Sequence, residues 1–170
     1  LLPGLLAHCQ QDYHVLEIEG VRIQNYESTY YDTPKLNAYL DHHNGHLNRS
    51  KIRVRNYVES EVTFFELKSK DNHMRTIKAR TQVPFRSQEM PQEGQELLEK
   101  NWKHAETALE PALLVDFQRI MLANPDKGER VTIDLDLSFA LPGSNALISL
   151  PGLCVVEVKR GRKSSPSPIQ

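Results

Sequence analysis

The chain has 170 residues, of which 39% are hydrophobic and 25% are charged, the make-up of one ordinary soluble globular domain with a real core. The net charge of −1 gives no overall field that would attract nucleic acid or an anionic membrane, so an anion site would need a local concentration of basic residues. Two distant cysteines, Cys9 and Cys154, argue against a disulfide framework and favour a reducing cytoplasm.

Targeting segments are not visible in the sequence. No apolar run approaches the roughly 20 residues of a membrane-spanning helix, and no signal-peptide pattern occurs. The first residue is leucine rather than methionine, and the last lies in a Ser/Pro-rich stretch. We therefore expect this chain to be a piece of a longer protein.

The first third of the chain predicts two helices and two strands. Residues 1–11 are an apolar helix candidate, and residues 15–18 and 25–31 have the β-prone composition of strands. Thr33 has the side chain of a helix N-cap and is followed by proline, so a helix is expected over residues 35–43.

The middle of the chain predicts a three-stranded meander and a helix. Residues 49–58 alternate strictly between polar and apolar positions, and residues 62–70 and 75–83 supply the next two strands. Residues 93–109 carry leucine, tryptophan and alanine at helical spacing, which predicts a helix.

The last third predicts a long hairpin and a final strand. Residues 112–122 are ambiguous between helix and strand, and we interpret them as a strand because residues 130–139 alternate clearly after a turn-rich segment. Residues 153–159 form the last strand. We expect one α+β domain over residues 1–160 and a basic, Ser/Pro-rich tail or truncated connection over residues 161–170.

Five predicted strands share one plan, with an apolar face and a charged face, because successive side chains of a strand point to opposite sides. With Arg119, the charged faces hold ten cations: Lys51, Arg53, Arg55, Lys68, Lys70, Lys78, Arg80, Arg119, Arg130 and Lys159. They hold four carboxylates: Glu66, Asp134, Asp136 and Glu157. These faces therefore carry +6 and the remainder of the chain −7, which gives the total of −1.

Two folds can accommodate such strands. A sheet with one solvated face is the simpler reading. Like charges at neighbouring positions repel unless an anion or a carboxylate lies between them, however, and the Lys-x-Arg-x-Arg spacing is dense. We favour an antiparallel β-barrel with the charged faces lining a basic tunnel and the helices packed outside.

The charged faces suit phosphate chemistry. Arginine presents a planar fork that matches phosphate, and lysine adds a mobile point charge. Glu157 and the Asp134/Asp136 pair are the best candidates for holding a hard cation such as Mg²⁺ or Mn²⁺. In phosphoryl transfer, positioning and charge neutralisation do most of the catalysis. No Gly-rich phosphate loop of the Walker type is present.

The motifs of these strands resemble the VTC domain of the triphosphate tunnel metalloenzymes, which are related to the CYTH group. They are TYYDTP at 29–34, KIRVRNY at 51–57, FELKSK at 65–70, TIKAR at 76–80, FQRIML at 117–122, ERVTIDLDLSF at 129–139 and VVEVK at 155–159. They occur in the family's order and cover most of the chain. The family's first strand and its closing C-terminal motif have no counterpart in this sequence, so the resemblance implies a barrel that lacks those segments.

The resemblance implies synthesis of polyphosphate from ATP with Mn²⁺ or Mg²⁺, and it assigns roles to residues. The implied catalytic, phosphate-binding cations are Arg53, Arg55, Lys68, Lys78, Arg119, Arg130 and Lys159. Lys51, Lys70 and Arg80 are further phosphate-binding candidates from the charged faces. Glu157 is the implied metal ligand, whereas Asp134 and Glu66 either bind metal or pair with arginines.

Three functions remain open at this point. The leading hypothesis is a polyphosphate polymerase that passes the terminal phosphoryl group of ATP to a polyphosphate chain. The alternatives are a metal-dependent triphosphatase, with water as the acceptor, and a module that binds polyphosphate without turnover. The expected partners are ATP or another triphosphate and polyphosphate; nucleic acid is not expected, and the oligomeric state is left open.

Overall fold

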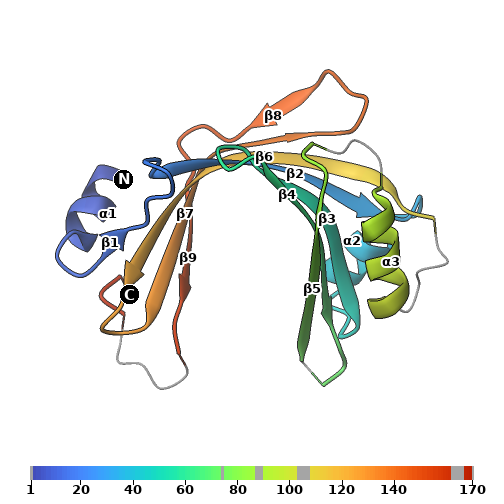
Figure 1. The fold of residues 1–170 in the computed structure, drawn as a ribbon, viewed down its shortest axis with the longest axis horizontal. Helices are drawn as coiled ribbons and strands as arrows, with labels where there is room; N and C mark the ends of the chain where they lie inside the picture. Colours follow the sequence, from blue (N-terminus) through green and yellow to red (C-terminus); the bar gives the residue numbers. More distant parts are fainter. Residues whose placement is uncertain (1, 74, 87–89, 103–107, 162–166, 170) are drawn as a thin grey trace. The chain divides into compact units, whose positions relative to one another are not determined.

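A computed structural model describes residues 2–73, 75–86, 90–102, 108–161 and 167–169. It contains three helices and nine strands among these residues (Figure 1). The helices are α1 (Leu2–Cys9), α2 (Asn37–His43) and α3 (Gln92–Asn101). The strands are β1 (His14–Val15), β2 (Ile23–Asp32), β3 (Arg49–Tyr57), β4 (Val62–Lys70), β5 (Thr76–Val83), β6 (Glu110–Asn124), β7 (Glu129–Ala140), β8 (Leu147–Ser149) and β9 (Val155–Lys159).

All nine strands belong to one sheet, whose order is β5-β4-β3-β2-β6-β7-β8. Strand β1 pairs with β6, and β9 pairs with β7, both antiparallel. The α+β class and the antiparallel sheet predicted from the sequence are confirmed. Among the described residues, no pairing joins β5 to β8, the two strands at the ends of this order. The sheet is therefore open and does not close into a complete barrel.

The chain divides into two compact units. The first unit comprises Leu1–Asn25, Phe117–Leu137 and Ser149–Gln170, and the second unit comprises Tyr26–Asp116 and Ser138–Ile148. Strands β2, β6 and β7 run through both units. Of the helices described in either unit, none has the length and apolar character that crossing a membrane would require.

The core of the second unit lies between α3 and the sheet. Phe65 and Leu67 of β4, Ile52 of β3 and Leu98 of α3 are fully buried there, and Figure 1 shows α3 against β4 and β5. The helix approaches closely at Gly94, because a Cβ atom at that position would lie 2.8 Å from the Phe65 ring. The apolar faces of β3 and β4 are therefore covered by a helix, as the alternation predicts.

The core of the first unit is built from β6, β7 and the N-terminal segment. Val131 and Ile133 of β7 have no exposed surface, and Ile120 of β6 packs beside them. Cys9 at the end of α1 belongs to this cluster. Ile169, near the other end of the chain, packs against the cluster. Part of the tail region is thus packed onto the first unit.

A buried polar cluster stabilises the first unit near the same residues. Glu129 is 1% exposed, and its Oε1 atom accepts hydrogen bonds from the Tyr13 hydroxyl and, at 2.7 Å, from the Ser167 hydroxyl. Burial raises the pKa of Glu129, but the two hydroxyl donors and the charges of Arg160 and Lys127 outweigh it and lower this pKa. The carboxylate is therefore held ionised inside the unit.

Helix α2 begins later than the sequence predicts. Its N-cap is Leu36, in a left-handed conformation with φ of 54°, and not Thr33. The Thr33 hydroxyl still accepts a hydrogen bond from the backbone N–H of Asn37 at 3.1 Å. The other capping oxygens come from Asp32, whose carboxylate accepts hydrogen bonds from the backbone N–H groups of Ala38 and Tyr39, both at 2.8 Å. Asp32 lies outside the helix, so a search for a local cap does not find it.

Three other features of the secondary structure differ from the prediction. Helix α3 ends at Asn101, and the predicted continuation through residues 103–107 lies outside the described residues. Strand β8 lies between the strands predicted over residues 130–139 and 153–159, where no strand was predicted. Asp136 has a φ of 49°, so the strict alternation expected along β7 is interrupted there.

Candidate functional site

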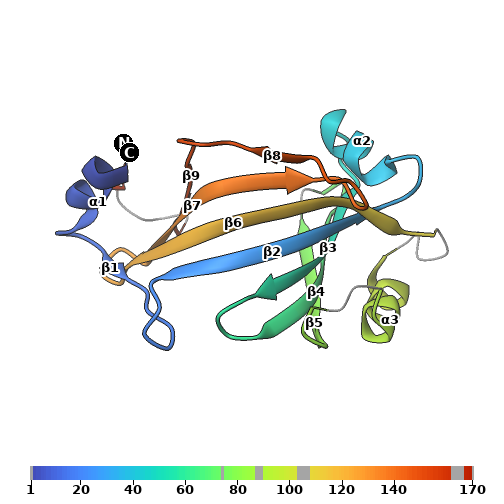
Figure 2. The same ribbon diagram turned by 90° about the horizontal axis from the view of Figure 1, so that it is seen from above.

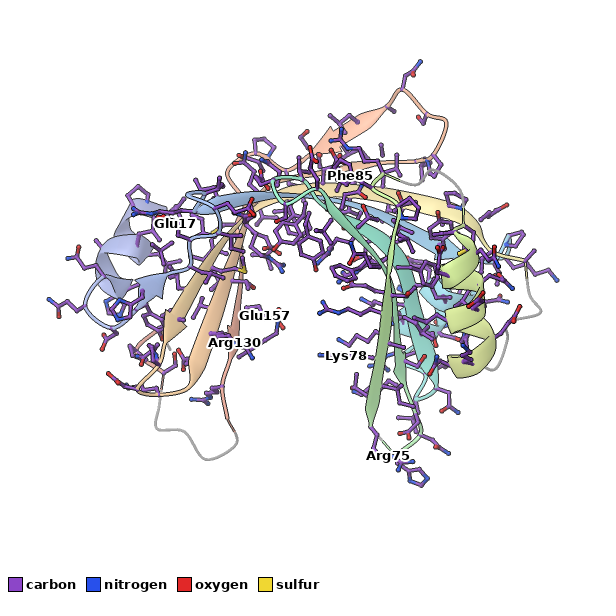
Figure 3. All side chains as sticks on the ribbon, viewed as in Figure 1. Glu17, Arg75, Lys78, Phe85, Arg130 and Glu157 are labelled. Atoms are coloured by element: carbon purple, nitrogen blue, oxygen red, sulfur yellow. The ribbon has the colours of Figure 1, made fainter. Side chains whose placement is uncertain are left out.

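The second unit carries a face on which basic residues meet in register. Strands β3, β4 and β5 pair so that Lys51, Lys68 and Lys78 form one row across the three strands. The next row holds Arg53, Glu66 and Arg80. Figure 3 shows Lys78 on the side of β5 away from α3. Three lysines in direct register repel one another, so this face favours a bound anion.

Arg53 is held rigidly within this face. Its Nε atom donates to Glu66 Oε2 at 2.6 Å, and its Nη1 atom donates to the Tyr30 hydroxyl at 3.1 Å. Burial lowers the pKa of Arg53, but the charges and hydrogen bonds of Tyr30 and Glu66 outweigh it and raise this pKa. The guanidinium is therefore a fixed cation with a defined orientation.

Arg55 occupies a different environment on the same strand. Only 6% of it is exposed, its Nε atom donates to the Ser28 hydroxyl at 3.0 Å, and its guanidinium lies 5.3 Å from the centre of the Tyr26 ring. Burial and the neighbouring Arg53 lower the pKa of Arg55. That direction is expected where positive charge is in excess, and a phosphate at this place would relieve it.

A small basic pocket lies at the end of this face. It has a volume of about 160 Å³. Its walls comprise His42, Arg49, Lys51, Lys68, Lys70 and Thr76. Burial and the charges of Lys51, Arg49 and Lys68 lower the pKa of His42. The pocket thus combines basic side chains with a histidine whose protonation an anion would favour.

The first unit carries an arginine–aspartate pair. Arg119 of β6 and Asp134 of β7 form a two-pronged ion pair, with Nε–Oδ1 at 2.6 Å and Nη2–Oδ2 at 2.7 Å. The Arg119 guanidinium also lies 5.0 Å from the centre of the Phe117 ring. The side chains of the pair are 17% and 15% exposed, so Asp134 serves here to orient an arginine.

Strands β7 and β9 bring further charges together. Arg130 lies opposite Lys159 in the register, and Thr132 lies opposite Glu157. Figure 3 shows the side chains of Arg130 and Glu157 close to one another on this pair of strands. The Glu157 carboxylate is 3.0 Å from the Lys159 ammonium, and both side chains are 56% exposed. This carboxylate is open to a ligand from solvent.

The donor set fits a metal ion of one kind. Among the described residues, no three His, Cys, Asp or Glu side chains gather into a group that could hold a metal. Mg²⁺ and similar cations, however, are commonly held by one or two carboxylates together with substrate phosphates and water. Glu157 is an exposed carboxylate beside cations that suit phosphate, so it fits such a shared site.

The amino-acid sequence matches one family model, that of the VTC domain, over residues 2–169. The chain belongs to the VTC domain family. Among curated proteins, none matches this VTC domain significantly. The family assignment thus rests on a sequence match that spans nearly the whole chain, and it agrees with the resemblance seen in the strand motifs.

Solved structures give a weaker likeness to this VTC domain. A Vibrio parahaemolyticus protein provisionally described as an adenylate cyclase matches with 14% identity and a TM-score of 0.48, over 83% of this chain and 63% of that one. A protein from Pyrococcus horikoshii OT3 matches with 14% identity and a TM-score of 0.49, over 94% of this chain and 73% of that one. The VTC domain chain thus spans less than two thirds of the first of these proteins.

The structure sorts the residues predicted from the VTC motifs into two groups. The second unit contains Lys51, Arg53, Arg55, Lys68, Lys70, Lys78 and Arg80. The first unit contains Arg119, Arg130, Glu157 and Lys159. The two carboxylates whose role was left open, Glu66 and Asp134, each form an ion pair with an arginine. Glu157 also forms an ion pair, with Lys159, but its side chain is 56% exposed, whereas those of Glu66 and Asp134 are 18% and 15% exposed.

Sequence reasoning missed the contribution of β2 to the VTC domain site. Ser28 and Tyr30 lie opposite Arg55 and Arg53 in the register, and both hydroxyls accept hydrogen bonds from those arginines. The positive charges of Arg53, Arg55 and Lys51 lower the pKa of Tyr30 in spite of its burial. Polar residues at alternate positions of β2 were the available signal.

Proposed function

We propose that this VTC domain transfers the terminal phosphoryl group of a nucleoside triphosphate to the end of a polyphosphate chain. The bond between the γ-phosphorus and the β–γ bridging oxygen breaks, the nucleoside diphosphate leaves, and an oxygen of the acceptor phosphate forms the new bond. The observation that carries the proposal is the row of Lys51, Lys68 and Lys78 beside the fixed Arg53. Such a face neutralises a chain of phosphates, which is the main task in this chemistry.

Each of the two units contributes residues with a proposed task. Arg53 and Arg55 orient phosphate oxygens through their guanidinium forks, and the lysines follow the charge along the phosphate chain. Arg130 and Lys159 bind phosphate oxygens beside Glu157, and Arg119, oriented by Asp134, adds a further fork. Glu157 would hold a Mn²⁺ or Mg²⁺ ion, which would supply positive charge to neutralise the phosphate.

Hydrolysis is the second candidate function. The Glu157 side chain is 56% exposed, so water reaches the proposed metal carboxylate. With water as the acceptor, the same groups would release phosphate from a triphosphate. The difference between transfer and hydrolysis thus lies in the acceptor and not in the phosphate-binding residues.

Incubation of the purified protein with ATP and Mn²⁺ tests the proposal. Polyphosphate that gel electrophoresis resolves as a ladder is the expected product. Free phosphate as the only product would show that the protein is a triphosphatase and not a transferase. Tight binding of polyphosphate without any turnover would leave a binding module.

Glu157→Gln tests the role of the carboxylate. Loss of a metal ligand is expected to lower turnover by roughly a hundredfold or more, while polyphosphate binding persists because the cations remain. The matched control is Glu17→Gln, because Glu17 is also a half-exposed carboxylate in the first unit that pairs with a nearby cation, Arg22. Equal turnover in both variants would remove Glu157 from the site.

A further inference from the structure

An apolar groove lies next to the basic face in the second unit. The proposed phosphoryl transfer assigns no role to this groove. Its volume is about 530 Å³, which is within the range of small-molecule sites. Helix α2, which follows the end of β2 (Figure 2), forms one wall with Leu36 and Tyr39. The facing walls come from Tyr30 of β2, Val115 of β6 and Phe139 of β7.

The groove exposes apolar side chains that are not buried in the core. Tyr39 is 57% exposed and Leu36 is 45% exposed, although both line a concave surface. Leu141 at another edge of the groove is 62% exposed. Concave apolar surface of this kind marks a ligand site more often than a plain solvated face does.

The groove and the basic pocket adjoin each other, because His42 and Lys51 line both. A ligand that reaches from one to the other would carry an apolar part joined to several negative charges. Inorganic tripolyphosphate has no apolar part, and a fatty chain would not use the row of lysines. A nucleoside triphosphate has both parts, with a base that can stack on aromatic side chains.

We propose that this groove binds the base and sugar of a nucleoside triphosphate whose phosphates lie on the basic face. The proposal rests on the proposed function, and it makes Tyr39 and Tyr30 binding residues for the nucleoside part. The Tyr39 ring is stacked against His43, with centroids 5.8 Å apart and planes at 22°, so its orientation is partly fixed. Polar groups are few on these walls, so the groove is expected to accept different bases.

Isothermal titration of the full chain, with ATP and with tripolyphosphate separately in Mg²⁺ buffer, tests the proposal. Tyr39→Ala removes one stacking surface and is expected to weaken ATP binding about tenfold while tripolyphosphate binding stays unchanged. Ala112→Trp, which fills the groove from β6, is expected to act in the same direction. Phe85→Ala is the matched control, because Phe85 is an exposed aromatic residue outside the groove (Figure 3).

The outcomes separate this proposal from the proposed function. Unchanged ATP binding in both groove variants, or an equal loss for ATP and tripolyphosphate, would overturn the nucleoside site while the phosphate site stands. Failure of the wild-type protein to bind either compound would overturn the proposed function itself, and the nucleoside site with it. Circular dichroism of each variant shows that it is folded before titration.

Discussion

Two arginines on one strand show how surroundings set the task of a single side chain. Arg53 faces the carboxylate of Glu66 and a tyrosine hydroxyl, and its pKa is raised. Arg55, two residues later, is buried against the Tyr26 ring, and its pKa is lowered. Arg53 is thus partly neutralised in the free protein, whereas Arg55 is the cation whose charge a bound phosphate would stabilise most.

Glu129 is a second residue whose surroundings decide its state, here for stability. Its Oε1 atom accepts two hydroxyl hydrogen bonds, and its Oε2 atom has no hydrogen-bond partner among the residues described. A buried carboxylate costs free energy unless its hydrogen bonds are made. The Tyr13 and Ser167 hydroxyls therefore hold together three segments that are distant in the sequence.

The variant Tyr13→Phe tests this cluster. Loss of the hydroxyl donor is expected to lower the free energy of unfolding by about 1–3 kcal/mol at neutral pH. Burial and the hydrogen bond to Glu129 raise the pKa of Tyr13 from 10 to about 12. Because the folded-state pKa is the higher one, this contribution is present below pH 10 and is lost as the pH rises through about 12.

Urea unfolding of both proteins at several pH values measures this effect. The difference between wild type and Tyr13→Phe should shrink from pH 9 to pH 12. A difference that stays constant over this range would show that the Tyr13 proton does not stabilise the folded state.

At the scale of elements, α3 lies in close contact with β4 in the second unit. Gly94 stands where α3 crosses Phe65, a ring with no exposed surface. Because the ring is enclosed by Ile52, Leu67 and other core residues, it has little room to move. The absence of a side chain at Gly94 therefore sets the distance between the helix and the sheet.

Gly94→Ala is expected to destabilise the protein although alanine favours helices. The gain in helix propensity is about 1 kcal/mol, and overpacking of a core costs about 1–3 kcal/mol. Chemical denaturation should show a net loss of stability for this variant, whereas Gln95→Ala, at the exposed neighbouring position, should lose none. Equal stabilisation by the two substitutions would contradict the close approach.

The elements also show which features local patterns can predict. The strands that carry Lys51, Lys68 and Lys78 follow from alternation, because the period of two acts within each strand. The cap of α2 follows only in part: the predicted Thr33 hydroxyl accepts a hydrogen bond from Asn37, but the Asp32 carboxylate reaches the helix from the preceding strand. The break at Asp136 is also hidden, since the polar and apolar residues of 130–139 continue to alternate through it.

The candidate site divides in the same way. The row of Lys51, Lys68 and Lys78 could be predicted in part, since alternation places each lysine on the charged face of its own strand. The partners of the arginines could not, because the pairing of Arg53 with Glu66 and of Arg119 with Asp134 depends on contacts between strands. The apolar groove is lined by residues of α2, β2, β3, β6 and β7, so the pattern of any one segment does not predict it.

At the scale of the whole molecule, a net charge of −1 conceals a strong local excess of positive charge. The chain belongs to the VTC domain family, and the register of β3, β4 and β5 places three lysines in one row. Aligned lysines stabilise no fold, so they are expected to be retained for binding. The central claim is thus that the basic face of the second unit binds a chain of phosphates.

The most direct test is the affinity for tripolyphosphate, measured by isothermal titration, of the double variant Lys51→Gln/Lys78→Gln. Both lysines are exposed and flank Lys68 on the neighbouring strands. The dissociation constant is expected to rise about tenfold or more, with no fall in melting temperature because like charges are removed. The control is Lys35→Gln/Lys100→Gln, two exposed lysines of the same unit that lie outside this face. Equal affinities in the two double variants would contradict the claim.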